Sequence, residues 1–253
     1  MASLATIGVL GGMGPQATIL FMQKLLKSVE AGDDRDHIPL LVDNNTQVPS
    51  RIKAILEDGD ETPGKTLAYM ARRLEDAGAN ALVMPCNTAH HYAEDIAAAI
   101  DIPFINMVAL SVEFAKSIAG LNGRIGVLGS PALRKVAVYE NALKNADLSA
   151  VYSDDEQELL RIIKHVKSKG PSSQIGDALN LIAGDLIDQG ADAIMICCTE
   201  FSVLAEHIKI NAPVCDTLDV LVKASAQFAK QTTNPIPPTN IQSASGPNAE
   251  LSY

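Results

Sequence analysis

The stretch Met84-Pro85-Cys86-Asn87-Thr88-Ala89-His90 follows the lead-in Gly78-Ala79-Asn80-Ala81-Leu82-Val83, and both return later in the chain. The second copy reads Gly190-Ala191-Asp192-Ala193-Ile194-Met195 and then Ile196-Cys197-Cys198-Thr199-Glu200-Phe201. Aligned on their first glycines, the copies place Cys86 opposite Cys198, since 198 − 86 and 190 − 78 both equal 112. A cysteine therefore recurs at one position of an internal repeat.

Two more pairs of segments extend this repeat. Ile7-Gly8-Val9-Leu10-Gly11-Gly12 returns 118 residues later as Ile125-Gly126-Val127-Leu128-Gly129-Ser130, and Ile102-Pro103-Phe104 returns 110 residues later as Ala212-Pro213-Val214. Three anchors in the same order with similar shifts indicate two homologous halves of roughly 110 residues. If the two halves face each other, Cys86 and Cys198 face each other too.

Short apolar runs alternate with amphipathic stretches along the whole chain. Strands are expected at residues 6–10, 39–42, 81–84, 103–105, 124–128, 150–152, 193–197 and 213–215. Helices are expected at residues 18–29, 63–77, 89–100, 110–119, 133–146, 155–167, 175–189 and 218–230. This alternation predicts an α/β protein with parallel sheets and helices on both faces.

The composition is typical of an ordinary soluble protein, and we expect its ligand to be a small molecule. The chain has 253 residues, of which 47% are hydrophobic, and its net charge of −10 disfavours nucleic acid as a partner. We find no leader pattern and no apolar run of membrane-spanning length, and expect a cytoplasmic protein that binds no membrane.

The four cysteines are expected to be free thiols. Residues 232–253, rich in Pro, Ser and Asn, are expected to form a flexible tail.

Both cysteine motifs stand where parallel sheets bind ligands, beyond the carboxyl ends of strands. Asn87 or Thr88 is expected to cap the helix after Cys86, and Thr199 the helix that begins near Glu200. Each thiol would then lie near the positive end of a helix.

Two further segments are expected on this rim. Gly11-Gly12-Met13-Gly14-Pro15 follows the first strand, and is either a tight turn or part of the site wall, without the spacing of a nucleotide-binding loop. The segment from Asn44 to Arg51 follows the second strand and supplies amides and a guanidinium. Arginine suits bidentate capture of a carboxylate, although a lone surface arginine is more often a solvated charge.

Several chemical roles can be weighed for the cysteines. Cys86, His90 and His91 provide too few ligands for a metal ion, so a metal site is disfavoured. A Cys-His hydrolase would leave Cys198 unexplained. A single cysteine is usually a small core residue, as we expect for Cys197 and Cys215, but two at equivalent strand ends favour proton transfer between two bases.

At these motifs the sequence resembles the cofactor-independent aspartate/glutamate racemase family, over about residues 4 to 230. The resemblance rests on Gly11-Gly12-Met13-Gly14-Pro15, Pro49-x-Arg51, Cys86-Asn87-Thr88 and Cys198-Thr199-Glu200. It implies two pseudo-symmetric doubly wound lobes with the site in the inter-lobe cleft. The expected limits are residues 1–106 plus 216–231 for the first lobe and residues 107–215 for the second.

The resemblance also implies the activity and its residues. Aspartate or glutamate would be racemised without pyridoxal phosphate or metal, with Cys86 and Cys198 as the two bases, in a homodimer. Arg51 would bind the distal carboxylate, and Ser130 stands where the family has threonine. The full set expected to contact the substrate is Met13, Asn45, Arg51, Asn87, Thr88, Ser130, Thr199 and Glu200.

Departures from the family pattern leave alternatives open. Cys197 replaces the usual glycine, Leu133 stands where many members have threonine, and a site lysine could be Lys164, Lys167 or Lys169. The related folds include maleate isomerases and arylmalonate decarboxylases, so an isomerase or decarboxylase of another small dicarboxylate is one alternative. A non-catalytic binding module is another, although a binder has no use for paired thiols.

Overall fold

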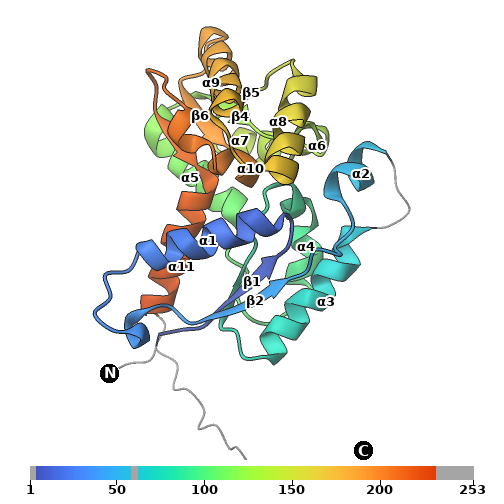
Figure 1. Cartoon of the computed structure of the whole chain (residues 1–253), viewed down its shortest axis with the longest axis vertical. Coiled ribbons are helices and arrows are strands. Elements are labelled where there is room, and N and C mark those ends of the chain that lie inside the picture. Colours follow the sequence, from blue (N-terminus) through green and yellow to red (C-terminus); the bar gives the residue numbers. More distant parts are fainter. Residues whose placement is uncertain (1–3, 58–61, 232–253) are drawn as a thin grey trace, which may run out of the picture.

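The computed structural model describes residues 4–57 and 62–231, and the tail expected at residues 232–253 lies outside this part. Figure 1 shows two sheets, the first in the lower part of the view and the second in the upper part. The first sheet holds β1 (Ile7–Gly11), β2 (Leu40–Asn44) and β3 (Ala81–Val83) in the parallel order β2-β1-β3. Its central strand β1 is wholly buried, as its unbroken apolar run predicts.

The second sheet repeats this arrangement with one strand more. It holds β4 (Arg124–Leu128), β5 (Ser149–Val151), β6 (Ala193–Ile196) and β7 (Val214–Asp216) in the parallel order β5-β4-β6-β7. The counterpart of β7 in the first half is a single bridge between Leu82 and Phe104, where a strand was expected at residues 103–105. Pro213 stands at the equivalent position directly before β7, so the proline at 103 does not explain the shorter pairing.

The two halves share a packing detail that explains why their first strands carry the same glycine. A methyl group on Gly8 would overlap the side chains of Leu82 and Ala79, and one on Gly126 would overlap Ile194 and crowd Ala191. Leu82 and Ile194 are equivalent in the repeat, as are Ala79 and Ala191. The sequence repeat is therefore a repeat of side-chain packing between neighbouring strands.

Helices cover both sheets, as the alternation of patterns predicts. The α-helices are α1 (Pro15–Lys27), α2 (Arg51–Leu56), α3 (Pro63–Asp76), α4 (Ala93–Ala97), α5 (Met107–Ala119), α6 (Pro131–Lys135), α7 (Val138–Asn145), α8 (Glu156–Lys169), α9 (Ser173–Asp188), α10 (Thr199–Ser202) and α11 (Thr217–Gln231). Three 3₁₀ segments, η1 (Asp34–Asp36), η2 (Thr88–Tyr92) and η3 (Ala205–His207), join them. The expected α/β class with parallel sheets flanked by helices is confirmed.

Helix boundaries differ from expectation at three places. The helix expected at residues 133–146 divides into α6 and α7, because Ala137 between them adopts a left-handed conformation with φ of 53°. The helix expected at residues 89–100 is η2 followed by α4. Helix α2 was not anticipated, since its six residues are too few to show an apolar period.

The last helix returns the chain to the first sheet. Leu218, Leu221 and Val222 of α11 share one apolar cluster with Ile7 and Val9 of β1. Helix α5, which packs against α11, contributes Val108, Val112 and Ala115 to a second cluster beneath β4 and β6. Helices α5 and α11 therefore join the two halves at the side remote from α2 and α3, as Figure 1 shows.

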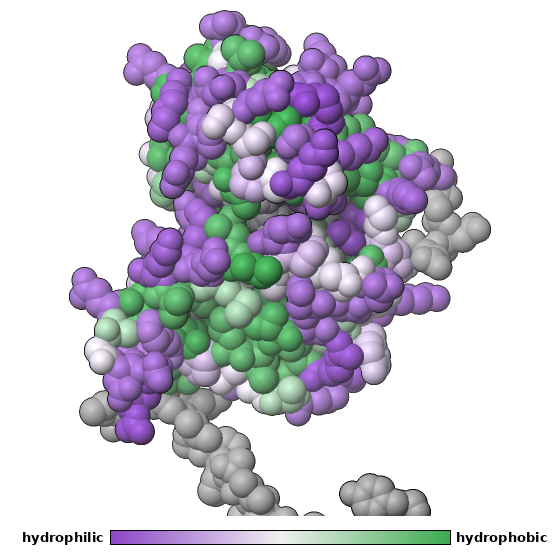
Figure 2. All heavy atoms as spheres, viewed as in Figure 1, coloured by the Kyte–Doolittle hydropathy of each residue, from purple (hydrophilic) through white to green (hydrophobic). Residues whose placement is uncertain are grey.

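One face of the first half carries exposed apolar side chains. Ile19, Met22 and Leu26 of α1 are 52%, 38% and 56% exposed, and with Ile38 and Leu40 they line an apolar groove. Figure 2 shows hydrophobic surface gathered over the lower part of the molecule, the half that holds α1 and β2 in Figure 1. Among the described helices, none has the length and apolarity needed to cross a membrane.

A buried chain of hydrogen bonds ties the two sheets together. The Tyr139 hydroxyl on α7 donates to Asn87 Oδ1 (2.6 Å), and Asn87 Nδ2 donates to Thr217 Oγ1 (3.1 Å). Thr217 in turn donates to the carbonyl oxygen of Ile196 at the end of β6 (2.8 Å). Because all these groups are buried, each bond replaces one that water can no longer make.

This chain of bonds yields a stability prediction. Tyr139→Phe removes the donor to Asn87 Oδ1, so we expect the free energy of unfolding to fall by about 1–3 kcal/mol. Urea denaturation monitored by circular dichroism measures the change.

Tyr152→Phe is the matched control. The Tyr152 hydroxyl is also buried, but it has no hydrogen-bond partner among the described residues. Its removal is expected to leave stability unchanged or raised, since an unsatisfied polar group is lost. Equal destabilisation by both substitutions would contradict the importance of the bond to Asn87.

Candidate active site

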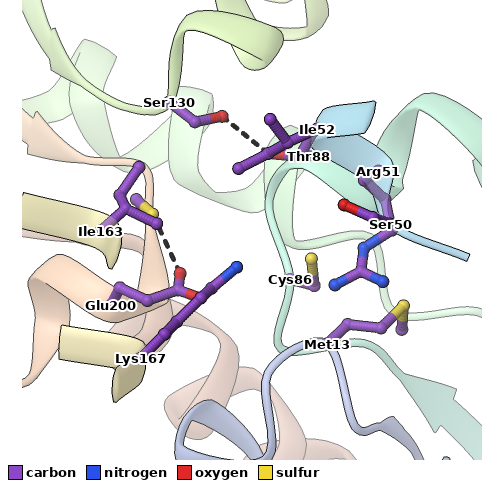
Figure 3. A pocket seen from close by; sticks show the side chains of 11 residues that line it. Met13, Ser50, Arg51, Ile52, Cys86, Thr88, Ser130, Ile163, Lys167 and Glu200 are labelled. Carbon is purple, nitrogen blue, oxygen red and sulfur yellow. Dashed lines mark hydrogen bonds and ion pairs between the residues drawn. The ribbon is translucent and has the colours of Figure 1, made fainter. Parts of the chain in front are cut away.

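Both cysteine motifs open into one pocket. It contains about 340 Å³ of empty space and lies beyond the carboxyl ends of β1, β3, β4 and β6. Its walls come from both halves of the chain (Figure 3): Met13, Ser50, Arg51, Ile52, Cys86, Thr88, Ser130, Ile163, Lys167, Cys198 and Glu200. The two cysteines that the repeat makes equivalent therefore border the same space.

Cys86 follows β3 and is 7% exposed. Burial raises the pKa of its thiol, and the positive charge of Arg51 acts in the opposite direction. In Figure 3 the Arg51 guanidinium lies on the same side of the pocket as the Cys86 side chain. A cation beside a buried thiol favours the thiolate, which is the reactive form.

His90 holds the loop that carries Cys86. Its Nδ1 lies 2.9 Å from the Cys86 carbonyl oxygen, and its Nε2 lies 3.2 Å from the Met107 amide nitrogen. Since a backbone amide can only donate, Nε2 is the acceptor and Nδ1 carries the proton. Burial lowers the pKa of His90 to about 4. His90 is therefore a neutral structural link, and it does not line the pocket.

Cys198 follows β6 and is also 7% exposed. Its Sγ donates to Glu200 Oε2 (3.1 Å), and Glu200 Oε1 lies 3.3 Å from Lys167 Nζ on α8. Burial, then the charge of Glu200 and this hydrogen bond, raise the pKa of the Cys198 thiol well above its ordinary value. The two thiols thus have unlike surroundings.

Arg51 is held as the first residue of α2. Its Nη1 donates to the carbonyl oxygens of Val48 (3.3 Å) and Pro49 (3.0 Å). Its Nε is buried and has no hydrogen-bond partner among the described residues. The guanidinium therefore keeps donor capacity for a ligand.

Thr88 and Ser130 join the two halves across the pocket. Their hydroxyl oxygens lie 3.1 Å apart, and either can donate. Ser130 Oγ also accepts from the Leu133 amide, which caps α6 (3.3 Å). Leu133 itself is fully buried in the core.

Three residues of the expected set do not line the pocket. Asn45 Nδ2 contacts Met70 Sδ (3.6 Å), Asn87 bonds to Tyr139 and Thr217, and the Thr199 hydroxyl donates to the Pro85 carbonyl oxygen (3.2 Å). Their contacts with a substrate stay predictions.

The expected helix caps are correct in part. Asn87 holds the N-cap position of η2, but its side chain makes no capping bond there. The expectation for Thr199 is wrong, because Thr199 is the first residue of α10 and Cys198 holds the N-cap position. The side chains that were expected to cap these short helices bond instead to the opposite half of the chain.

Three wall residues were not expected, Ser50, Ile52 and Ile163, and a fourth, Lys167, was one of three candidate lysines. Of the three lysines considered in the sequence, only Lys167 lines the pocket. Ile163 and Lys167 are four residues apart on α8, so they share a helix face, and this spacing is the signal that could have found them.

The other two cysteines lie in the core, as expected. Cys197 and Cys215 belong to one apolar cluster, and the Cys197 Sγ donates to the Met195 carbonyl oxygen (3.5 Å). Burial raises the pKa of Cys215 to about 12. Within residues 4–57 and 62–231, no cluster of three or more His, Cys, Asp or Glu side chains is placed to hold a metal ion.

Comparison with known proteins identifies the family. The family model described as Asp/Glu/Hydantoin racemase matches residues 10–225, so the chain belongs to this family of racemases. The broad specificity amino-acid racemase RacX of Bacillus subtilis (strain 168) is 27% identical over 223 residues, 87% of this chain and 96% of RacX.

Other racemases are similar in structure or in part of the sequence. The structure of Picrophilus torridus aspartate racemase matches with a TM-score of 0.79 and 26% identity, covering 89% of this chain and 94% of that one. Glutamate racemase of Persephonella marina (strain DSM 14350 / EX-H1) is 29% identical over 164 residues, 64% of this chain and 61% of that protein.

The low pKa of His90 predicts acid sensitivity. Because the folded-state pKa of about 4 lies below the ordinary 6.5, the stabilisation is complete above pH 6.5 and is lost as the pH falls towards 4. This loss is worth about 3 kcal/mol, at 1.36 kcal/mol per pKa unit. Denaturant unfolding at a series of pH values measures it.

Two glutamine variants isolate this effect from acid titration elsewhere. His90→Gln is expected to be less stable at neutral pH but to lose less stability between pH 6.5 and 4 than the wild type. His91→Gln, in the exposed neighbour, should keep the wild-type dependence. An unchanged slope in His90→Gln would show that another group causes the acid sensitivity.

Proposed function

We propose that this protein racemises acidic amino acids by proton transfer between two thiols, without pyridoxal phosphate. The observation that carries the proposal is that Cys86 and Cys198, at equivalent strand ends of a repeat, border one pocket. Inverting Cα needs a base on one face and an acid on the other. A thiolate and a thiol can exchange these roles, so one site serves both directions.

The other side chains of the pocket wall can bind the negative charges that this reaction involves. Hydroxyl groups of Thr88 and Ser130 can donate to a substrate carboxylate, where negative charge grows as the proton leaves Cα. Arg51 offers a guanidinium to a second carboxylate. These groups support an aminodicarboxylate as substrate.

The relatives leave the choice of acid open. RacX is named as a broad specificity amino-acid racemase, while the Picrophilus torridus and Persephonella marina proteins are named for aspartate and glutamate. We propose that aspartate and glutamate are both in the substrate range, and that Arg51 sets the preference for them over neutral amino acids.

Racemisation in heavy water tests the two-thiol mechanism. The donating thiol has exchanged with solvent, whereas the accepting thiol holds the substrate proton until turnover is complete. At low conversion the product enantiomer should therefore carry deuterium at Cα, while the recovered starting enantiomer stays protiated. Mass spectrometry of the separated enantiomers measures the label.

Alanine variants provide the controls. Cys86→Ala and Cys198→Ala should each lower racemisation by about 10²–10⁴-fold, the usual worth of a general acid or base. Cys215→Ala, which removes a core thiol, should keep the rate. Equal label in both enantiomers from the earliest points would refute the mechanism. Release of carbon dioxide from malonates, or interconversion of alkenes, would instead identify the decarboxylase or isomerase alternative.

Arg51→Leu tests the recognition of the second carboxylate. A charge-assisted hydrogen bond is worth about 1.5–3 kcal/mol, so kcat/KM for aspartate and glutamate should fall by roughly 10- to 150-fold. Alanine, which has no second carboxylate, should show only the smaller loss that follows when the Arg51 charge no longer favours the Cys86 thiolate. Steady-state assays with the three amino acids measure the difference.

Arg51→Lys separates charge from geometry. Lysine keeps the positive charge but not the planar fork, so it should recover part of the loss for the acidic substrates only. An equal loss for alanine and the acidic substrates would instead assign Arg51 to the common α-carboxylate or to the fold.

A further inference from the structure

The two thiols of the pocket are equivalent in the repeat but differ in their charged neighbours. The Cys198 thiol donates to Glu200 Oε2 (3.1 Å), and the other carboxylate oxygen of Glu200, Oε1, lies 3.3 Å from Lys167 Nζ. No hydrogen bond from the Cys86 thiol to a carboxylate occurs among the described residues, and the first charge acting on Cys86 is that of Arg51. Figure 3 shows Lys167 and Glu200 entering from one side and Arg51 lying with Cys86 on the other.

We propose that Glu200 keeps the proton on Cys198, so that Cys86 is the first of the two thiols to lose its proton and the form that starts turnover carries a thiol at Cys198 and a thiolate at Cys86. Glu200 is then a positioning residue that acts through Cys198, and its carboxylate is engaged with protein groups rather than with the substrate. The proposal deepens the proposed function and rests on it for its catalytic consequence.

The geometry favours this distribution of protons for a simple reason. A carboxylate can only accept hydrogen bonds, so the contact with Glu200 Oε2 requires the proton on Cys198. If Cys198 lost that proton, two negative charges would face each other at hydrogen-bond distance. The Lys167 ammonium offsets part of this repulsion, because it lies 3.3 Å from the other Glu200 oxygen.

The charges nearest to the two thiols favour the same distribution of protons as the hydrogen bond does. Burial raises the pKa of each, Glu200 raises that of Cys198 further, and Arg51 lowers that of Cys86. Glu200 and Lys167 also act on Cys86, where the former raises the pKa and the latter lowers it. The charge with the largest effect on Cys198 is that of Glu200, and it disfavours a thiolate there. The charge with the largest effect on Cys86 is that of Arg51, and it favours one.

This asymmetry has a catalytic consequence. The Cys86 thiolate takes the Cα proton of one enantiomer and the Cys198 thiol donates its own, which leaves a thiol at Cys86 and a thiolate beside Glu200. The form that starts turnover returns when Cys86 releases a proton to solvent and Cys198 takes one up. Since racemisation has an equilibrium constant of one, kcat/KM must be equal for both enantiomers. The asymmetry therefore appears as one enantiomer having both the lower KM and the lower kcat.

Alkylation by iodoacetamide tests the proposal without any turnover. The reagent is small and neutral, and it reacts with thiolates. The rate at each cysteine is measured by peptide mass spectrometry, from below to above the ordinary thiol pKa of about 8.5. In the wild-type protein Cys86 should react at lower pH than Cys198. Faster reaction at Cys198 than at Cys86, or equal rates across the range, would overturn the proposal.

Two variants should move the Cys198 rate in opposite directions. Glu200→Gln replaces an acceptor by an amide that can donate to a thiolate, so alkylation of Cys198 should rise by about threefold or more for each unit that its pKa falls. Lys167→Met removes the offsetting charge and should slow it. The Cys86 rate should change less than the Cys198 rate, because Glu200 and Lys167 act on Cys86 through their charges alone. An unchanged Cys198 rate in Glu200→Gln would refute the role of Glu200.

Cys197 and Cys215 report whether a variant is folded, because both are buried in the core. If they become reactive in a variant, that variant is not properly folded, and the proposal is then tested by the pH dependence of alkylation in the wild-type protein alone. Failure of the proposed function is distinguishable, since it would appear as no racemisation with the order of alkylation intact. In an active protein, Glu200→Gln should also reduce the difference in KM between the two enantiomers.

Discussion

The arrangement of the pocket depends on the buried hydrogen-bond chain that joins Tyr139, Asn87, Thr217 and Ile196. Asn87 follows Cys86 directly, while Ile196 stands two residues before Cys198. Both thiols are thereby attached to one network that crosses between the sheets. Polar groups that are removed from water must keep their partners, so the two strand ends cannot shift independently without leaving a donor or acceptor unsatisfied.

A repeated scaffold supplies this geometry, but the side chains around it break the symmetry. Gly8 and Gly126 admit equivalent packing from the neighbouring strands, and so place the ends of β3 and β6 alike. The charged groups lie at corresponding places of the two halves but differ in kind: Arg51 begins α2, which follows β2, and Lys167 lies on α8, which follows β5. The backbone is therefore shared by the two halves, whereas the nearest charges differ between the two thiols. The proposed proton transfer needs both properties, because it requires two thiols that differ in protonation.

The sequence was sufficient for the fold class, the repeat and the meeting of Cys86 with Cys198, because these follow from apolar periods and from the common edge of parallel strands. The sequence alone could not show which partners the polar side chains at that edge bind. The partners of Asn87 are Tyr139 and Thr217, 52 and 130 residues away, so no local pattern could separate a capping role from a bridging one. The four-residue spacing of Ile163 and Lys167 places them on one face of α8, but it does not show that this face, rather than that of Lys164, meets the pocket.

Substrate charge and thiol protonation are coupled through Lys167. In the structure its ammonium is paired with Glu200, which leaves Arg51 as the cation with donor capacity in the described pocket wall. A carboxylate that reached Lys167 would compete with Glu200 for this one cation, and burying it there requires such pairing. A Glu200 carboxylate deprived of Lys167 would repel a Cys198 thiolate more strongly and hold the Cys198 proton more firmly. An acidic substrate would thus favour a proton on Cys198, the state that we propose Glu200 maintains, whereas a neutral amino acid would leave the ion pair and the thiol unchanged.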